Sequence, residues 1–201
     1  IKIARIMSTV KPYVHIPESE YEEKYFDNYF QGVYQRSKPR AKRRAVDSFI
    51  REEICTLHYL SKALTRRLGE MAFPVKTGHI STALANYSYL IESDYVSYMA
   101  HNTLHIAASR SSKFQFYNQF ECHHQKDYLY FYMLTLQRLG LDPATEMVNI
   151  GGLLTQDSPI YELLYAYIND IQLNDQNLKV ESISDDQKQF YFDLYLCKSC
   201  V

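Results

Sequence analysis

KFQFYNQFE, at residues 113–121, opens the stretch of sequence that decides the fold. It is a short run rich in aromatic residues, a composition that predicts a β-strand. Asp127 then begins an aromatic-rich helical pattern that ends at Gly140, and the apolar run at 147–150 predicts a second strand. A strand, a helix and a strand in this order indicate a mixed α/β domain.

Gly151 and Gly152 follow the second strand directly, and a helix is predicted over about 157–170. A strand that ends on paired glycines before a helix is a place where the backbone can approach a ligand closely. The same pair is equally typical of a tight turn that needs residues without a Cβ atom. Both interpretations stay open at the level of sequence.

The residues before this stretch predict a strand hairpin. Residues 95–100 and 103–108 pair naturally about His101-Asn102, and 113–121 adds a third strand. Three meandering strands followed by helix, strand and helix form one α/β half, and the first half of the chain shows a less regular version of the same plan.

The patterns elsewhere in the chain are shorter. Ser61 is a predicted N-cap, and Pro74 a predicted helix end. The predicted elements are extended segments at 1–7 and 13–16, a helix that begins at Pro17 and buries an aromatic stripe as far as Val33, either two strands or a strand and a helix over 45–60, a helix after Ser61, a helix at 79–90 and a terminal helix at 189–197.

The composition is that of a folded globular protein. Hydrophobic residues make up 46% and charged residues 22% of the 201 positions, and the net charge is -1. There is no overall attraction to nucleic acid or to an anionic membrane. Nineteen tyrosines and no tryptophan indicate half-buried faces whose hydroxyls reach water.

No apolar run approaches the roughly 18–20 residues that a membrane helix requires, and no secretory leader opens the sequence. We therefore expect a cytoplasmic protein without a membrane partner. The four cysteines lack an even spacing, which suits reduced thiols. Because the chain starts at Ile1, we expect that residues upstream belong to the natural protein.

Five phrases of the sequence resemble an uncharacterised bacterial family, a domain of unknown function with an actin-like fold. The phrases are Ile16-Pro17 before a Glu- and Tyr-rich segment, FYNQF (116–120), KDYLYFYMLTLQRLGLDP (126–143), VNIGG (148–152) and YELLYAYI (161–168). The resemblance implies a mixed α/β fold with an actin-like, ribonuclease H-like two-lobe architecture. The lobes would be 1–91, incomplete in this chain, and 92–201.

The resemblance also implies a nucleotide site. Actin-like ATPases bind ATP and Mg²⁺ between their lobes, with two phosphate hairpins and an adenosine loop that reads apolar strand, Gly-Gly, helix. The resemblance assigns Gly151 and Gly152 to that loop. The second phosphate hairpin would be 94–107, but its turn is His101-Asn102 rather than an acid followed by glycine, and Asp94 lies at the strand's start. No carboxylate motif for Mg²⁺ appears.

Two cysteine-containing segments have weak metal-site patterns. Cys197 and Cys200 supply only half of a structural zinc site, and no second pair exists. Cys122-His123-His124, with His101 and His105 across the sheet, is the other candidate, but adjacent residues of a strand point to opposite faces. We therefore predict no metal site.

A basic segment offers a route to nucleic acid. RSKPRAKRR, at 36–44, carries six basic residues and no acid, and such a cluster can neutralise phosphates. A solvated, charged loop explains the same composition. The candidate nucleic-acid-binding residues are Arg36, Lys38, Arg40, Lys42, Arg43 and Arg44.

These observations leave three hypotheses about function. The first is a degenerate, non-catalytic actin-like protein that acts by binding an unidentified protein partner. The second is an actin-like ATPase or phosphotransferase with ATP in an interlobe cleft, and the third is a nucleic-acid-associated protein that uses residues 36–44. An actin-like fold alone does not decide among them, because folds host many functions.

Overall fold

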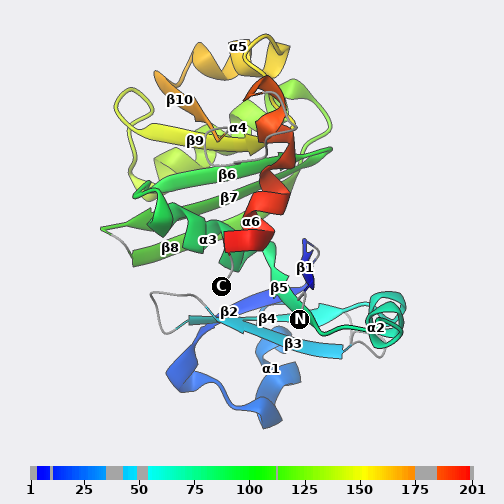
Figure 1. Cartoon of the computed structure of the whole chain (residues 1–201). Helices are drawn as coiled ribbons and strands as arrows, with labels where there is room; N and C mark the ends of the chain where they lie inside the picture. The colour runs from blue at the N-terminus through cyan, green and yellow to red at the C-terminus, as the bar shows by residue number, and fades with distance from the viewer. Residues whose placement is uncertain are drawn as a thin grey trace. The chain divides into compact units, whose positions relative to one another are not determined.

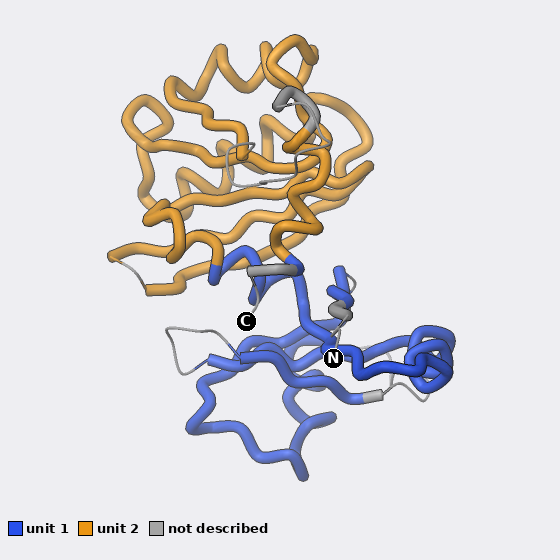
Figure 2. Tube along the Cα trace, in the orientation of Figure 1, with its two compact units in different colours: residues 1–86, 197–201 blue, residues 87–196 orange. Residues whose placement is uncertain are grey.

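A computed structural model describes residues 4–9, 11–34, 43–48, 54–111, 113–174 and 185–199. The chain divides into two compact units, residues 1–86 with 197–201 and residues 87–196 (Figure 2). Each unit is described by itself. The predicted lobe boundary at residue 91 stays a prediction.

The second unit is built on a five-stranded sheet (Figure 1). The strand order is β10-β9-β6-β7-β8, with the meander β6, β7 and β8 antiparallel and β9 and β10 parallel to β6. The elements are β6 (Tyr95–Ala100), β7 (Thr103–Arg110), β8 (Lys113–Glu121), α4 (Gln125–Leu139), β9 (Met147–Gly152), α5 (Pro159–Tyr165), β10 (Asp170–Leu173), η3 (Asp185–Tyr191) and α6 (Phe192–Ser199).

The predicted core of this unit is confirmed. The strand at 113–121 and the hairpin about His101-Asn102 form as predicted. α4 begins two residues before Asp127, whose carboxylate accepts hydrogen bonds from the backbone N–H groups of His123 and His124 at 2.8 and 2.9 Å. It ends at Gly140, whose positive φ of 68° is the left-handed helix terminus that glycine favours.

The two faces of the sheet are covered differently. One face carries the main hydrophobic core, in which Tyr95, Ile106 and Ile150 pack with residues of α4 and α5 such as Tyr132 and Leu164. Buried polar groups on this face are paired, since the Ser97 and Tyr132 hydroxyls lie 2.6 Å apart. The opposite face carries the end of α3 and α6, as the Ser88 to Ser109 hydroxyl contact at 3.0 Å shows for α3.

The predicted helix at 157–170 is wrong in length. α5 begins after Ser158, whose hydroxyl accepts a hydrogen bond from the Tyr161 backbone at 3.2 Å, and ends at Tyr165. Asp170 instead begins the short strand β10, which places Ile171 and Leu173 against the core. Two inward residues in a four-residue strand are too few to produce a recognisable period of two.

The first unit contains a three-stranded antiparallel sheet of order β2-β4-β3 and a parallel pair, β1 with β5. The region 45–60 therefore forms two strands rather than a strand and a helix. The elements are β1 (Ala4–Ser8), β2 (Tyr13–Pro17), η1 (Glu18–Glu20), η2 (Glu23–Tyr25), α1 (Phe26–Gln31), β3 (Arg43–Ser48), β4 (Ile54–Leu60), α2 (Lys62–Gly69), β5 (Val75–His79) and α3 (Ile80–Leu90).

Two predictions in this unit are wrong. Pro17 is the last residue of β2 rather than the first of a helix, and the helical stripe shortens to α1, where Phe26 and Phe30 pack on Tyr59. The helix after Ser61 ends at Gly69 rather than at Pro74. β5 was not predicted, because Val75 is its only apolar residue. The cap at Ser61 is confirmed by its 3.2 Å hydrogen bond from the Leu64 backbone.

Candidate functional site

Gly151 and Gly152 are the last two residues of β9, which lies beside the central strand β6 of the second unit's sheet. They lie in register with Tyr98 and Met99 of the parallel strand β6. The ladder continues into the turn, since the Leu153 N–H donates to the Met99 carbonyl at 2.8 Å. The predicted sequence of strand, glycine pair and helix is therefore present, and the backbone at the pair is hydrogen-bonded.

The ring of Phe192, from α6, covers Gly151. A Cβ atom at Gly151 would lie inside the volume of this ring, so the position tolerates only glycine as long as Phe192 is in place. Phe192 is buried, and its ring meets Tyr87 edge-on at 4.9 Å between centroids and lies 6.1 Å from the ring of Tyr98. The group that approaches the Gly151 backbone closely is therefore the Phe192 side chain of the same protein.

Glycine is required at position 152 for a different reason than at position 151. Its φ is +100°, a conformation that L side chains rarely adopt. A Cβ atom here would clash with the Met99 carbonyl oxygen and lie 2.9 Å from the ring of Tyr98. Close packing therefore accounts for both glycines, while their assignment to nucleotide binding stays a prediction.

The same side of the sheet continues as a row of rings from Phe192 across β6, β7 and β8. Tyr98 stacks on His105 at 5.7 Å between centroids, and His105 stacks on Tyr117 at 6.3 Å. The His105 Nδ1 atom lies 2.9 Å from the Tyr117 hydroxyl. His105 is buried in this row and hydrogen-bonded to it.

The cysteine and histidine groups that the sequence singled out do not assemble into a cluster. Within the described residues, no group of three or more His, Cys, Asp or Glu side chains could hold a metal ion. Cys122 is a buried free thiol, and burial raises its pKa to about 12. Cys197 is half-buried in α6, and Cys200 lies outside the described residues.

The hairpin turn that would serve as a phosphate loop has its carbonyl groups engaged. The His101 carbonyl accepts a hydrogen bond from the Tyr128 hydroxyl at 2.7 Å, and the Asn102 carbonyl accepts one from the Cys122 N–H at 2.8 Å. His101 itself has a positive φ of 46°. The turn therefore holds the end of β8 and the start of α4 in place.

Most of the basic segment lies outside the part of the chain that the structure describes. Arg36, Lys38, Arg40 and Lys42 are outside it, and for Arg43 only the backbone position in β3 is described. Arg44 is described, and its guanidinium donates to Asp27 at 2.7 Å. The nucleic-acid assignment of the segment stays a prediction.

Asp27 joins Arg44 to Tyr59 across the first unit's surface. The Tyr59 hydroxyl donates to the second carboxylate oxygen at 2.6 Å. This hydrogen bond, followed by the one from Arg44, lowers the pKa of Asp27. Arg44 also lies over the ring of Phe26, at 5.4 Å from its centroid. The Arg44 side chain thus contributes to local packing.

A buried histidine cluster in the first unit was not predicted. It consists of His15 from β2, His58 from β4 and His79 from β5; His15 and His79 meet at the hydroxyl of Ser81 at the start of α3, and the ring of His58 lies against that of His79. That hydroxyl lies 2.7 Å from His79 Nδ1 and 3.0 Å from His15 Nε2. The rings of His58 and His79 have centroids 5.3 Å apart.

The hydrogen bonds assign the tautomers of two rings. The Ser81 N–H donates to His79 Nδ1 at 3.2 Å, so this nitrogen carries no proton. The Ser81 hydroxyl must then donate to the same nitrogen, and His15 Nε2–H donates to Ser81 Oγ. The network is satisfied only while His79 is neutral, because a proton on Nδ1 would face two donors.

Burial keeps two of these rings, His15 and His58, uncharged at neutral pH. It lowers the pKa of both His15 and His58 to about 4. In the described part of the chain, neither ring nitrogen of His58 has a hydrogen-bond partner. The nearby carboxylate of Asp47 accepts a hydrogen bond from the backbone N–H of His79 at 3.0 Å. Burial raises the pKa of Asp47. The only sequence signal was a histidine inside each of two apolar strands, YVHIP and ICTLHYL.

The second unit's architecture defines the class of the protein. A three-stranded meander continued by parallel strands, with helices on both faces, is the ribonuclease H-like arrangement, and the chain has an actin-like, mixed α/β fold. It is similar to the crystal structure of a protein with actin-like ATPase fold and unknown function from Bacteroides thetaiotaomicron VPI-5482, with a TM-score of 0.72 at 17% identity over 92% of this chain and 72% of that one.

Residues 2–171 match the model of a family described as protein of unknown function, DUF3822, and the chain belongs to this family. The fold and family expected from the sequence phrases are thereby confirmed. A comparison with curated proteins found no match. No helix in the described ranges combines the length and apolar character that crossing a membrane requires.

Proposed function

We propose that this protein is a non-catalytic actin-like protein of the bacterial cytoplasm that acts by binding a protein partner. One observation carries the proposal: the ring of Phe192 occupies the space over Gly151. A nucleotide that used the glycine pair in the manner of an adenosine loop would need this same backbone surface.

The energetic cost of clearing that surface supports the proposal. Phe192 is 1% exposed and is packed between Tyr87 and Tyr98. Exposing a buried Phe side chain to water costs roughly 1.5–3 kcal/mol before any rearrangement of α6. A nucleotide would have to supply this free energy in addition to its own binding.

The hairpin turn supports the same conclusion. His101 and Asn102 stand where a phosphate loop would carry an acid and a glycine, and their carbonyls already bind Tyr128 and Cys122. Phosphate sites present free backbone N–H groups to the ligand, whereas the contacts of this turn run through its two carbonyls to other parts of the chain. The residues at the glycine pair and at this turn therefore fit a structural role better than ATP with Mg²⁺.

Calorimetric titration of the protein with ATP and Mg²⁺, with ADP as a control, tests the proposal. We expect no heat of binding up to millimolar nucleotide. Binding at micromolar concentration would refute the proposal and support the ATPase alternative. In that case an unchanged affinity in Gly152→Val would place the nucleotide elsewhere, whereas a loss of binding would locate it at the glycine pair only if circular dichroism shows that the variant is folded, because a side chain at Gly152 also clashes with the Met99 carbonyl.

A further inference from the structure

The start of α3 is held to the strands of the first unit by hydrogen bonds between side chains. The Ser81 hydroxyl lies 2.7 Å from His79 Nδ1 in β5 and 3.0 Å from His15 Nε2 in β2. The Thr82 hydroxyl lies 2.8 Å from that of Thr56 in β4. Three strands and one helix of this unit therefore meet in one polar network.

The network leaves no room for a positive charge. His79 Nδ1 accepts hydrogen bonds from the backbone N–H and the hydroxyl of Ser81, so a proton on this nitrogen would face two donors. The ring of His58, with its centroid 5.3 Å from that of His79, is fully buried, and neither of its nitrogens has a hydrogen-bond partner among the described residues. A protonated His58 would be a buried charge without an ion-pair partner in the described ranges, which is costly.

The groups around the rings do not compensate such a charge. They are Tyr13 from β2, Asp47 from β3, Thr56 from β4, and Ser81 and Thr82 from α3. Tyr13 contributes a ring, whose centroid lies 4.8 Å from that of His79. Asp47 is the carboxylate in this set, but it already accepts a hydrogen bond from the backbone N–H of His79 at 3.0 Å. Burial raises the pKa of Asp47, so this carboxyl loses its charge at a higher pH than an ordinary one and is a poor counterion in acid.

We propose that the histidine cluster is a pH-sensitive conformational switch. Proton uptake separates the start of α3 from β2, β4 and β5 and opens the first unit, while the second unit stays folded. Opening gives the rings access to water, in which a charged imidazole is hydrated. None of the residues involved belongs to the glycine pair or to the hairpin turn, so the switch operates whether or not the protein binds nucleotide.

The direction of the switch follows from burial. It lowers the pKa of His15 and His58 to about 4 in the closed form, below the ordinary value of 6.5. Between these two values the open form binds protons that the closed form excludes. The first unit is therefore closed above this range and opens as the pH falls through it.

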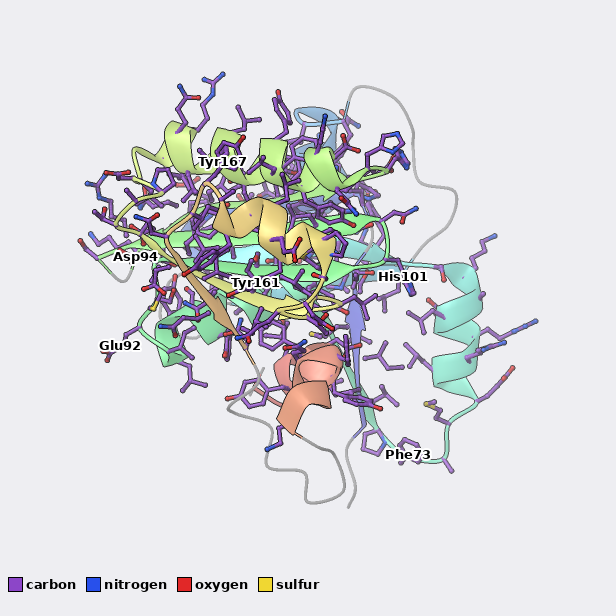
Figure 3. The ribbon with its side chains drawn as sticks, turned by 90° about the horizontal axis from the view of Figure 1, so that it is seen from above. Phe73, Glu92, Asp94, His101, Tyr161 and Tyr167 are labelled. Carbon is purple, nitrogen blue, oxygen red and sulfur yellow. The ribbon has the colours of Figure 1, made fainter. Side chains whose placement is uncertain are left out.

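The histidines of the second unit lack this conflict. His101, labelled in Figure 3, His123 and His124 are exposed and can be protonated in water. The buried His105 has its Nδ1 atom 2.9 Å from the Tyr117 hydroxyl, and a hydroxyl oxygen accepts a hydrogen bond from a protonated nitrogen. Acid should therefore act on the first unit before it acts on the second.

Hydrogen–deuterium exchange of the full chain, followed by mass spectrometry at pH 7 and pH 5, tests the switch. The exchange rates are corrected for the effect of pH on intrinsic exchange. The amides of β4 and of residues 80–86 in α3 should then lose about tenfold or more of their protection at pH 5, whereas those of α4 and β9 should keep theirs. A histidine with a pKa of about 4 in the closed form and 6.5 in the open form favours opening about 30-fold at pH 5, and Asp47 offsets part of this effect.

Variants identify the ring responsible. His58→Leu removes a proton site that makes no hydrogen bond within the described residues, so it should leave the protection at pH 7 unchanged and raise that of residues 80–86 at pH 5 about tenfold. His123→Gln is the matched control, because His123 is an exposed histidine of the second unit, and it should behave as the parent chain. NMR titration of the parent chain needs no variant. The Cε1–H signals of His15 and His58 should report proton uptake at the pH at which residues 80–86 lose protection.

Four results overturn the switch. The first is protection of residues 80–86 that is equal at pH 7 and pH 5, and the second is an equal loss of protection in α4. The third is a pH response that His58→Leu leaves unchanged. The fourth is an NMR titration in which His15 and His58 take up protons while residues 80–86 stay protected.

Discussion

Acid should destabilise the first unit through its buried histidine cluster. Burial lowers the pKa of His15 and His58 to about 4 in the folded chain, from an ordinary value of 6.5. The unfolded chain therefore binds more protons between pH 6.5 and pH 4. The free energy of unfolding is highest above this window and falls as the pH falls through it.

The size of the loss follows from the two pKa shifts. Each histidine lowers the free energy of unfolding by about 3.4 kcal/mol once the pH is below its pKa in both the folded and the unfolded chain. At pH 5 the loss is about 2 kcal/mol for each. Burial raises the pKa of Asp47, so the folded chain protonates this carboxyl at a higher pH than the unfolded chain does. Acid therefore stabilises the folded chain through Asp47, and the net loss is smaller than the sum for the two histidines. A loss of this order is a large part of a typical domain's stability.

Urea unfolding at pH 7 and pH 5, followed by circular dichroism, measures the effect. His58→Leu should remove about 2 kcal/mol of the difference between the two pH values. It should leave the stability at pH 7 unchanged or higher, because the ring it replaces is buried without hydrogen bonds. His123→Gln alters an exposed histidine and should leave the pH dependence intact. A free energy of unfolding that is equal at pH 7 and pH 5 would refute the reasoning, as would an unchanged slope in His58→Leu.

Three further predictions concern packing, charge and nucleic acid. Phe192→Ala should cost about 3–5 kcal/mol of stability and Gly151→Ala about 1–3 kcal/mol. The double variant should cost clearly less than the sum of these two losses, because removing the ring makes room for the methyl group. Additive losses in urea unfolding would show that the two residues do not interact. Tyr59→Phe should cost about 1 kcal/mol, and NMR titration should show the pKa of Asp27 moving up toward its ordinary value; an unmoved pKa would contradict the role of the hydroxyl. Single-stranded DNA should show no salt-dependent binding, whereas a steep dependence that flattens on alanine substitution of Arg40, Lys42, Arg43 and Arg44 would favour the nucleic-acid alternative.

Local sequence signals predicted most of the second unit. The aromatic-rich run KFQFYNQFE and the turn at His101-Asn102 were sufficient for the meander, because hairpins depend on contacts between neighbouring residues. β5 and β10 were missed for the opposite reason. β5 is held by pairing with β1, and β10 by pairing with β9. When a strand this short is held mainly by pairing with a distant strand, its own sequence shows no clear strand pattern.

The candidate site shows the same division. The glycine pair indicated a close approach to the backbone, and the approach exists. Its occupant is Phe192, which lies 41 positions after Gly151 in the sequence, and no local pattern connects the two. The histidine cluster is similar, since His15, His58 and His79 come from three strands and share no spacing.

By itself, the sequence indicated the class of the domain and the strand meander, and its phrases resembled the family to which the chain belongs. The class and the meander follow from the spacing of apolar residues and from turn chemistry within a few residues. The tertiary structure alone decided that an internal ring covers the glycines and that two of the three buried histidines, His15 and His79, share the hydroxyl of Ser81. Each of these depends on distances between segments far apart in the chain, which only the packing of strands and helices determines.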